Sequence, residues 1–579
     1  MKQLLSIHAN LEYCKVSCIL CLFTTTVFGQ VQFVENANEL GVNVNCDYTL
    51  FGNGISFFDY DNDGWDDITV ATVDGSPIRF LKNINGNFVA QTINIPNNTD
   101  RNKQINWVDI DNDGDNDLFI TSDNAGNRLF ENLGNLIMSE ITDTSGMLSD
   151  NFPYYGASWG DYNGDGYLDV FISVRDPLIP NLLYKNNGNR TFTLANVEAG
   201  LETTGYMSFC SAFLDYDKDG DQDIYVSNDK YVNPNLMYRN NGDGTFTEVG
   251  QETGSGVYIG AMSVTVEDIN DDSFLDIYIT NDDNDSVLLV NNGDGTYSDL
   301  AQSQQVTFNS NGWGAVFLDA DNDKDLDLYV SGESDGTLPQ YLSSAFYENI
   351  DQSYYQLNNE AVPNDFAYSF GNALGDTDND GYPEIVVNNI DHENIFLWKN
   401  TSITDNNWLK IRLEGTISNR NGVGSFIEIS INGNKQYRYT CLGEGYLSQN
   451  SASEQFGLGS DTVVDYVKVT WLSGLEDIIY DVPANQSVKI VEGSALSIDE
   501  SDNMTSVKVF PIPAKDIINF NSLNTIDKVE VYNALGQLLL LKLPVAHDFS
   551  IDISNIDKGH YYVRMYTQDQ IETTRFIKR

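Results

Sequence analysis

Apolar and polar positions alternate along residues 30–404, and each alternating stretch lies beside a short acidic segment. In the first copy, Phe57 lies two positions before the acidic segment, and Ile68 and Val70 lie at its tenth and twelfth positions. The other copies place apolar residues at the same positions. Apolar residues at every second position, many of them β-branched, indicate strands. Each acidic segment is therefore predicted to be a loop between two strands.

The acidic segment follows one nine-residue pattern, D-x-[DN]-x-D-G-x-x-[DE], at intervals of 50 to 57 residues. We number these loops 1 to 7 in chain order; they begin at Asp59, Asp109, Asp161, Asp215, Asp268, Asp319 and Asp376. A period this regular is typical of a repeat architecture. The sixth position is Gly in five copies, which favours a left-handed turn, but it is Ser273 in loop 5 and Lys324 in loop 6. We therefore expect loops 5 and 6 to be weaker.

Hairpin signals follow most of the loops, as in residues 240–246 and 291–297. Each period then holds four short antiparallel strands, which is the content of one propeller blade. The sequence predicts an all-β protein in which residues 30–404 form a seven-bladed β-propeller, followed by two small β-sandwich-like domains. Because the last period stops near Trp398, we expect residues 31–36 to supply the missing outer strand of the seventh blade.

The loop pattern suits a hard cation. Oxygen atoms at positions one, three, five, seven and nine can surround one ion, and calcium accepts six to eight such ligands. An EF-hand is excluded because position twelve is Val or Ile in all copies, where that motif needs Glu. Zinc is disfavoured since the loops contain no His or Cys. The alternative is a set of solvated acidic turns without an ion.

The pattern resembles the FG-GAP, or VCBS-type, calcium loops of integrin α-chain propellers and of many bacterial surface proteins. The resemblance covers residues 30–400 and implies up to seven Ca²⁺ ions, one per blade, with blades five and six the weakest cases. The ligands that it implies are Asp59, Asp61, Asp63 and Asp67; Asp109, Asp111, Asp113 and Asp117; Asp161, Asn163, Asp165 and Asp169; Asp215, Asp217, Asp219 and Asp223; Asp268, Asn270, Asp272 and Asp276; Asp319, Asp321, Asp323 and Asp327; Asp376, Asp378, Asp380 and Glu384.

The acidic repeat ends after residue 404, and residues 405–493 are rich in β-branched runs with a hairpin turn at Asn432-Gly433-Asn434. Five ordered motifs in this segment resemble the ASPIC/UnbV domain, and they begin at Gly422, Gly445, Phe456, Trp471 and Ala484. The same pairing with a VCBS-type propeller characterises the cartilage acidic protein-like family. The resemblance implies no defined activity for this domain.

The two ends of the chain carry transport signals. Residues 1–29 have Lys2 and Lys15 before an apolar run and end on a small residue, which is typical of a secretory signal peptide. After a linker, residues 494–503, the segment 504–579 resembles the type A sorting domain of the type IX secretion system, through runs at 510–514, 529–537 and 559–563. The resemblance implies contact with that secretion machinery and a secreted or outer-membrane surface location in a Bacteroidetes-type bacterium.

The charge and the hydrophobic content of the chain limit the kinds of binding partner that it can have. The chain has 31 Lys and Arg against 85 Asp and Glu, a formal net charge of −54, yet 41% of its residues are hydrophobic, which excludes a disordered acidic chain. This sign of charge disfavours nucleic acid and anionic membranes. No apolar run is long enough to predict a transmembrane segment. Outside the signal peptide Cys46, Cys210 and Cys441 remain, so either one disulfide with a free thiol or three buried thiols are open.

No catalytic constellation is evident in the sequence. His392 is the only histidine of the propeller segment, and it is predicted to lie in a polar turn. Aromatic residues in the long segments between repeats suit a sugar or protein ligand, or packing between blades. We therefore expect a monomeric, calcium-binding, surface adhesion module for an extracellular glycan or protein. The alternative is a polysaccharide lyase or hydrolase on a propeller scaffold, which would need convergent acid and base groups in a pocket.

Overall fold

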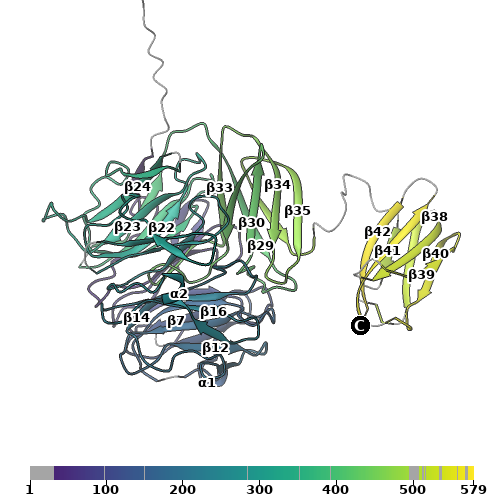
Figure 1. Cartoon of the computed structure of the whole chain (residues 1–579), viewed down its shortest axis with the longest axis horizontal. Coiled ribbons are helices and arrows are strands. Elements are labelled where there is room, and N and C mark those ends of the chain that lie inside the picture. Colours follow the sequence, from purple (N-terminus) through teal and green to yellow (C-terminus); the bar gives the residue numbers. More distant parts are fainter. Residues whose placement is uncertain are drawn as a thin grey trace, which may run out of the picture.

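The computed structural model is nearly all β (Figure 1), with two single-turn helices, α1 (Thr142–Ser145) and α2 (Gly250–Thr253), among its described residues. It describes residues 31–494 and 507–578 except for residues 97, 149, 283–284, 351, 392, 511–513, 516, 534–536, 557 and 568–570. The predicted signal peptide, most of the predicted linker and His392 therefore lie outside the described residues. Among the described residues, no helix is long and apolar enough to cross a bilayer.

Each acidic repeat forms one four-stranded antiparallel sheet. In six sheets the strands follow chain order: β2 (Ile55–Phe58), β3 (Asp67–Val70), β4 (Arg79–Ile84) and β5 (Asn87–Gln91); β6 (Asn102–Val108), β7 (Asp117–Ser122), β8 (Arg128–Asn132) and β9 (Met138–Glu140); β10 (Tyr154–Gly160), β11 (Asp169–Val174), β12 (Leu182–Asn186) and β13 (Phe192–Leu194); β14 (Ser208–Leu214), β15 (Asp223–Asn228), β16 (Leu236–Asn240) and β17 (Phe246–Glu248); β18 (Thr265–Glu267), β19 (Asp276–Ile279), β20 (Val287–Asn291) and β21 (Tyr297–Asp299); β22 (Gly312–Leu318), β23 (Asp327–Gly332), β24 (Ser344–Ile350) and β25 (Tyr354–Leu357).

The last sheet closes the ring with the first strand of the chain. It contains β26 (Ser369–Gly375), β27 (Glu384–Asn389) and β28 (Phe396–Asn400), and its outer strand is β1 (Phe33–Glu35), in which Phe33 pairs with Asn400. The expected contribution of residues 31–36 is thereby confirmed. The first strands of successive sheets also contact one another around a closed circle, from β2 through β26 and back to β2. These contacts and the sheets together make the predicted propeller.

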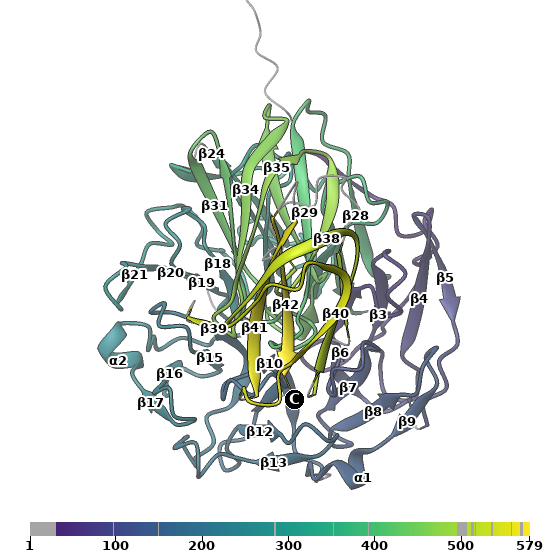
Figure 2. The ribbon, with the colours of Figure 1, turned by 90° about the vertical axis from the view of Figure 1, so that its right-hand side faces the viewer.

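The residues after the propeller form a β-sandwich of two sheets around Trp471 and Phe456, which are almost fully buried. One sheet contains β29 (Asn407–Glu414), β33 (Ser453–Gly459) and β36 (Gln486–Val491), and the other contains β30 (Phe426–Ile431), β31 (Asn434–Tyr439), β34 (Val463–Thr470) and β35 (Glu476–Pro483). This sandwich lies beside the propeller in Figure 1 and in front of it in Figure 2, which is turned by 90°. We call it the second domain.

A loop of the second domain enters the centre of the propeller. Within it, the two-residue strand β32 (Ser448–Gln449) pairs in parallel with β2, so that the second domain adds a strand to the first propeller sheet. Tyr446 and Leu447 are fully buried in one aromatic cluster with Phe209 and Trp313. The Tyr446 hydroxyl donates a hydrogen bond of 2.7 Å to the Phe51 carbonyl oxygen. This central plug was not predicted from the sequence.

The last described segment forms a third unit. It contains β37 (Val507–Phe510), β38 (Ile517–Asn533), β39 (Leu538–Lys542), β40 (Ala546–Asp552), β41 (Gly559–Thr567) and β42 (Ile571–Lys578). The long strand β38 pairs with four others, including β41, and Ile518, Phe520 and Val563 form part of its buried core. The expectation of small β domains after the propeller is confirmed.

Candidate metal sites in the acidic loops

The first Asp of each loop folds the loop around its own carboxylate. In loop 1 the Asp59 Oδ1 atom accepts the backbone N–H of Asp63 at 2.9 Å, and Oδ2 accepts that of Gly64 at 3.0 Å. The position-six N–H donates to the first Asp in every loop, through Gly64, Gly114, Gly166, Gly220, Ser273, Lys324 and Gly381. The first carboxylate therefore has a fixed orientation in all copies.

Loops 5 and 6 keep this geometry without glycine. Ser273 and Lys324 adopt positive φ angles of 73° and 94°, in the same left-handed region as Gly64 at 90°. An L-residue in that region costs about 1–2 kcal/mol. These two positions are therefore strained, but both loops close as the others do. The Lys324 side chain turns away from loop 6 and contacts Asp461 of the second domain, at 2.6 Å.

The position-nine carboxylate is fixed by the loop itself and by the third strand of the sheet. Asp67 is fully buried, and it accepts N–H groups from Tyr60 at 3.3 Å and from Asn83 of β4 at 2.7 Å. Burial, reinforced by the neighbouring Asp61 and Asp59, raises the pKa of Asp67 to about 9. Burial raises the pKa of Asp117 and Asp276 in the same way, to about 8. The ionised form of these carboxylates is therefore disfavoured unless a cation lies beside them.

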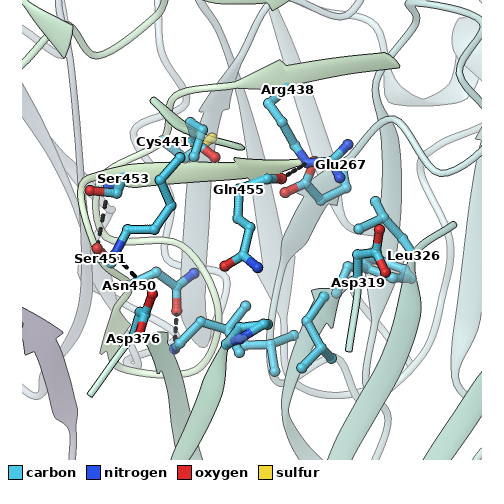
Figure 3. Close-up of a pocket in the computed structure, with 18 of the residues that line it drawn as sticks. Glu267, Asp319, Leu326, Asp376, Arg438, Cys441, Asn450, Ser451, Ser453 and Gln455 are labelled. Carbon is cyan, nitrogen blue, oxygen red and sulfur yellow. Dashed lines mark hydrogen bonds and ion pairs between the residues drawn. The ribbon is translucent and has the colours of Figure 1, made fainter. Parts of the chain in front are cut away.

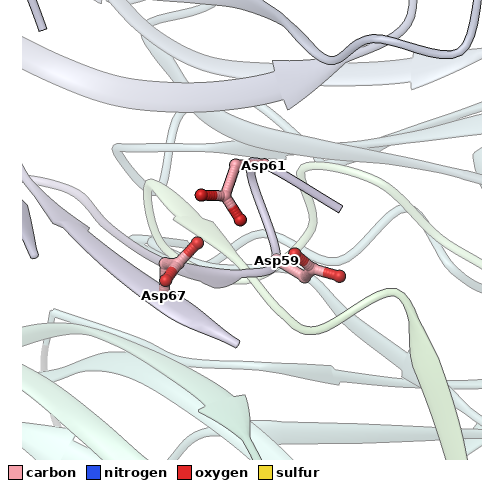
Figure 4. A group of neighbouring side chains, drawn as sticks. All are labelled: Asp59, Asp61 and Asp67. Atoms are coloured by element: carbon pink, nitrogen blue, oxygen red, sulfur yellow. The ribbon is translucent and has the colours of Figure 1, made fainter. Parts of the chain in front are cut away.

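Five loops bring three carboxylates close enough to hold a metal ion, with one oxygen of each residue within 4.8 Å of the others (Figure 4). These groups are Asp59, Asp61 and Asp67; Asp109, Asp111 and Asp117; Asp215, Asp217 and Asp223; Asp319, Asp321 and Asp323; Asp376, Asp378 and Glu384. In loops 3 and 5 position three is Asn163 or Asn270, so that those loops offer an amide in place of one carboxylate. Position five is exposed in every loop.

Several buried carboxylate oxygens in these groups have no hydrogen-bond partner. The Oδ1 atoms of Asp61, Asp111 and Asp217, all at position three, and Oδ1 of Asp215 are shielded from solvent and unpaired. A buried carboxylate oxygen left without a partner carries a large desolvation cost, which a hard cation removes. The residues present therefore fit an oxygen-liganded divalent ion, and the ion would neutralise charges that otherwise repel one another.

An asparagine that was not predicted from the sequence as a functional residue recurs on the third strand of every propeller sheet. Its members are Asn83, Asn132, Asn186, Asn240, Asn291, Asn349 and Asn400. The Asn83 side chain donates to the Asp66 carbonyl of its own loop and to the Thr377 carbonyl of the neighbouring loop, at 3.0 and 2.8 Å. This residue therefore ties neighbouring loops together. Its signal in the sequence is an Asn that lies 23 to 30 residues after the first residue of each acidic motif.

A cavity of about 90 Å³ lies between the propeller and the second domain (Figure 3). Glu267, Glu444 and Glu454 line it together with Arg438, whose Nε donates to the Gln455 carbonyl oxygen at 3.1 Å. Burial raises the pKa of Glu444 to about 7, and burial next to Glu267 raises that of Glu454. The cavity lies at the junction of the two domains, and no histidine is among the described residues that line it.

The three cysteines among the described residues are free thiols. Cys46 and Cys210 are fully buried, and Cys441 is partly buried. Of the two alternatives left open by the sequence, the structure has three unpaired thiols. Burial raises the pKa of both Cys46 and Cys210 to about 12.

Comparison with protein families finds three models along the chain. An FG-GAP-like repeat matches residues 59–120, 109–172, 215–279 and 268–330; ASPIC and UnbV matches residues 415–497; and a secretion system C-terminal sorting domain matches residues 508–579. The sorting domain at residues 508–579 implies that the protein is secreted or held at the cell surface in Bacteroidetes. The matched ranges agree with the loops, the second domain and the third unit.

Two curated proteins align over much of the chain. Cartilage acidic protein 1 of Xenopus tropicalis is 24% identical over 475 residues, which cover 74% of this chain and 71% of that protein. Cartilage acidic protein 1 of Homo sapiens is 25% identical over 321 residues, which cover 51% of this chain and about half, 48%, of the human protein.

Among solved structures, the extracellular domain of a one-component system from B. thetaiotaomicron aligns at 12% identity with a TM-score of 0.36, over 95% of this chain and 59% of that one. PorZ, a surface component of the type-IX secretion system of Porphyromonas gingivalis, aligns at 12% identity with a TM-score of 0.23, over 91% and 81%. The family matches carry the assignment: this chain is an FG-GAP-repeat propeller with an ASPIC and UnbV domain and a secretion sorting domain, similar to cartilage acidic protein 1.

Proposed function

We propose that this protein is a calcium-loaded binding module of the cell surface or the extracellular medium, and that it holds a glycan or protein ligand without transforming it. The observation that carries the calcium part is the set of unpaired, buried position-three oxygens at Asp61, Asp111 and Asp217. Their repetition at one position of a repeated loop favours one ion per loop over an accidental cluster. The sorting domain supports action outside the cell, where calcium is abundant.

The proposed ligand surface is the propeller face opposite the acidic loops. Those loops join first and second strands, so the segments before each first strand and between second and third strands lie at the other end of the sheets. These segments carry exposed aromatic side chains at Tyr48, Tyr231, Tyr258, Tyr341 and Phe366. Exposed aromatic rings on several loops of one face suit stacking on sugars or packing on a protein. The second domain packs on the acidic loops, at the other end of the sheets, and its loop with Tyr446 reaches the centre of this face at Phe51.

Calcium removal tests the first part. An ion present at 100 times its dissociation constant stabilises the folded state by about 2.7 kcal/mol, so several ions should raise the melting temperature by several degrees. The measurement is thermal unfolding of the protein after dialysis against EDTA, then with excess Ca²⁺, with equal Mg²⁺ as the control. A melting temperature that does not respond to Ca²⁺ contradicts the proposal.

A glycan and protein array with calcium present tests the ligand part. The variants Tyr258→Ala and Phe366→Ala remove rings that are 53% and 59% exposed, so they should weaken binding and leave the melting temperature unchanged. Tyr480→Ala, which removes a ring that is 68% exposed on the second domain, is the matched control. Release of altered products from a bound glycan would support the enzyme alternative instead.

A further inference from the structure

The seven acidic loops have nearly the same ligands but meet different charges from the third strand of their sheet. The residue directly before the repeated third-strand asparagine differs between the copies: Lys82, Glu131, Lys185, Arg239, Val290, Glu348 and Lys399. Two copies thus add a carboxylate, one adds an apolar side chain, and four add a cation. We call this the third-strand position.

In loop 7 a lysine ammonium lies among the calcium ligands. Lys399 Nζ is 2.7 Å from Asp378 Oδ1, 2.6 Å from Glu384 Oε1 and 3.6 Å from Asp380 Oδ2. Three of the four ligand side chains therefore already share one cation. The fourth, Asp376, is paired at 3.0 Å with Lys410, which comes from β29 of the second domain.

Loop 1 repeats this arrangement. Lys82 Nζ contacts both Asp61 and Asp63, the latter at 2.9 Å. Arg412 of the second domain lies 2.6 Å from Asp59 Oδ2. Loops 1 and 7 are thus each paired with two cations of the chain itself, one from the third-strand position and one from the second domain.

Loops 5 and 6 lie at the other extreme. In loop 6 the third-strand position is Glu348, and within the described part of the chain no Lys or Arg nitrogen lies within 4 Å of Asp319, Asp321 or Asp327. In loop 5 the third-strand position is Val290, and the described residues likewise put no such nitrogen on Asp268 or Asp276. Within 4 Å, therefore, the described residues give Asp268, Asp276, Asp319, Asp321 and Asp327 no ion-pair partner, and Arg438 of the second domain acts on Asp319 and Asp271 only from farther away.

We propose that the third-strand position places four of the seven loops at two extremes: loops 5 and 6 require calcium and bind it tightly, whereas loops 1 and 7 carry their own counter-ions and bind it most weakly. This inference rests on the proposed calcium function. It reverses the order given by the sixth position, which made loops 5 and 6 the weakest. A resident ammonium must be displaced, or must repel the entering ion, and both effects lower the affinity.

Loops 1 and 7, which carry their own counter-ions, lie next to each other in the ring. Repeats 1 and 7 meet where the ring closes, since β1 completes the sheet that holds β28. At this junction the first and last repeats are held by strand pairing and not by a chain connection, so repulsion between uncompensated carboxylates there would act to open the ring. Internal cations keep this junction neutralised when calcium is scarce, and calcium then adds stability in the remainder of the ring.

Exchange of the third-strand residues between copies tests the proposal in the full-length protein. Val290→Lys supplies loop 5 with the ammonium that loops 1 and 7 have, and Lys399→Val removes it from loop 7. Lys435→Val is the control, because Lys435 pairs with Glu428 of the second domain, 2.8 Å away, outside the loops. The number and affinity of bound Ca²⁺ ions are measured by equilibrium dialysis and by native mass spectrometry.

We expect wild-type protein to bind calcium in a tight and a weak class. Val290→Lys should weaken one tight site roughly 10-fold or more, and Lys399→Val should strengthen one weak site by a similar factor while lowering the calcium-free melting temperature. Equal affinity at all sites, or unchanged binding in both variants, overturns the sorting but leaves the proposed function standing. A wild-type protein that binds no calcium at all refutes the proposed function itself.

Discussion

Tyr446 lies in the loop of the second domain that enters the centre of the propeller. We therefore expect this residue to stabilise the propeller, although it belongs to the second domain. Its side chain is fully buried, and its ring centroid lies 4.9 Å from that of Trp313 and 5.8 Å from that of Phe209. Its hydroxyl is the donor to the Phe51 carbonyl. Replacement by Ala removes both the ring packing and the hydrogen bond.

The magnitude follows from these two losses. Truncation of a fully buried aromatic side chain to Ala costs about 3–5 kcal/mol. Removal of the hydroxyl alone, in Tyr446→Phe, should cost about 1–2 kcal/mol, because the hydrogen bond is lost and a buried carbonyl is left without a partner. With unfolding entropy scaled to about 460 residues, 1 kcal/mol corresponds to roughly 1 °C in the melting temperature. We therefore expect losses of about 4 °C for Ala and about 1 °C for Phe.

Calorimetry in saturating calcium measures both variants, with Tyr480→Ala as the exposed control. If the second domain were only tethered to the propeller, Tyr446→Ala would leave the propeller transition in place. A drop below about 1 °C in the Ala variant, or a control that falls as far, refutes the reasoning.

Two further predictions concern buried ionisable groups. The pKa of Glu444 is raised to about 7 and that of Glu454 is also raised, so the folded protein holds more protons than the unfolded chain above about pH 4.5. Stability in saturating calcium should therefore fall as the pH rises toward 8. The variant Glu454→Gln should make stability depend less on pH. Parallel pH curves for the variant and the wild type would contradict this. Cys46 and Cys210 are buried with raised pKa values, so native protein should not react with a thiol reagent at these two positions, whereas unfolded protein should react at all three cysteines. Rapid native labelling of Cys46 or Cys210 would show that the site opens.

The sequence predicted what depends on short-range pattern. The period of the acidic loops, the alternation around residues such as Ile68 and Val70, and the incomplete last repeat were enough for the sheets and for the closing strand β1. Lys399 and Tyr446 were not predicted, because their partners lie on other strands or in another domain. The contact between Lys324 and Asp461 was not predicted for the same reason.

The place of the second domain on the ring follows from position four of the loops. Loops 6, 7, 1 and 2, which are consecutive around the ring, have Asn there, whereas loops 3, 4 and 5 have Gly164, Lys218 and Asp271. Each of the four asparagine amides donates to the position-six carbonyl of the next loop, and each Oδ1 accepts from the second domain, at Asn322, Asn379, Asn62 and Asn112. One amide thus joins two blades and the second domain at once. Because the same side chains make both contacts, release of the second domain must also loosen the loops, and the two should unfold as one cooperative unit.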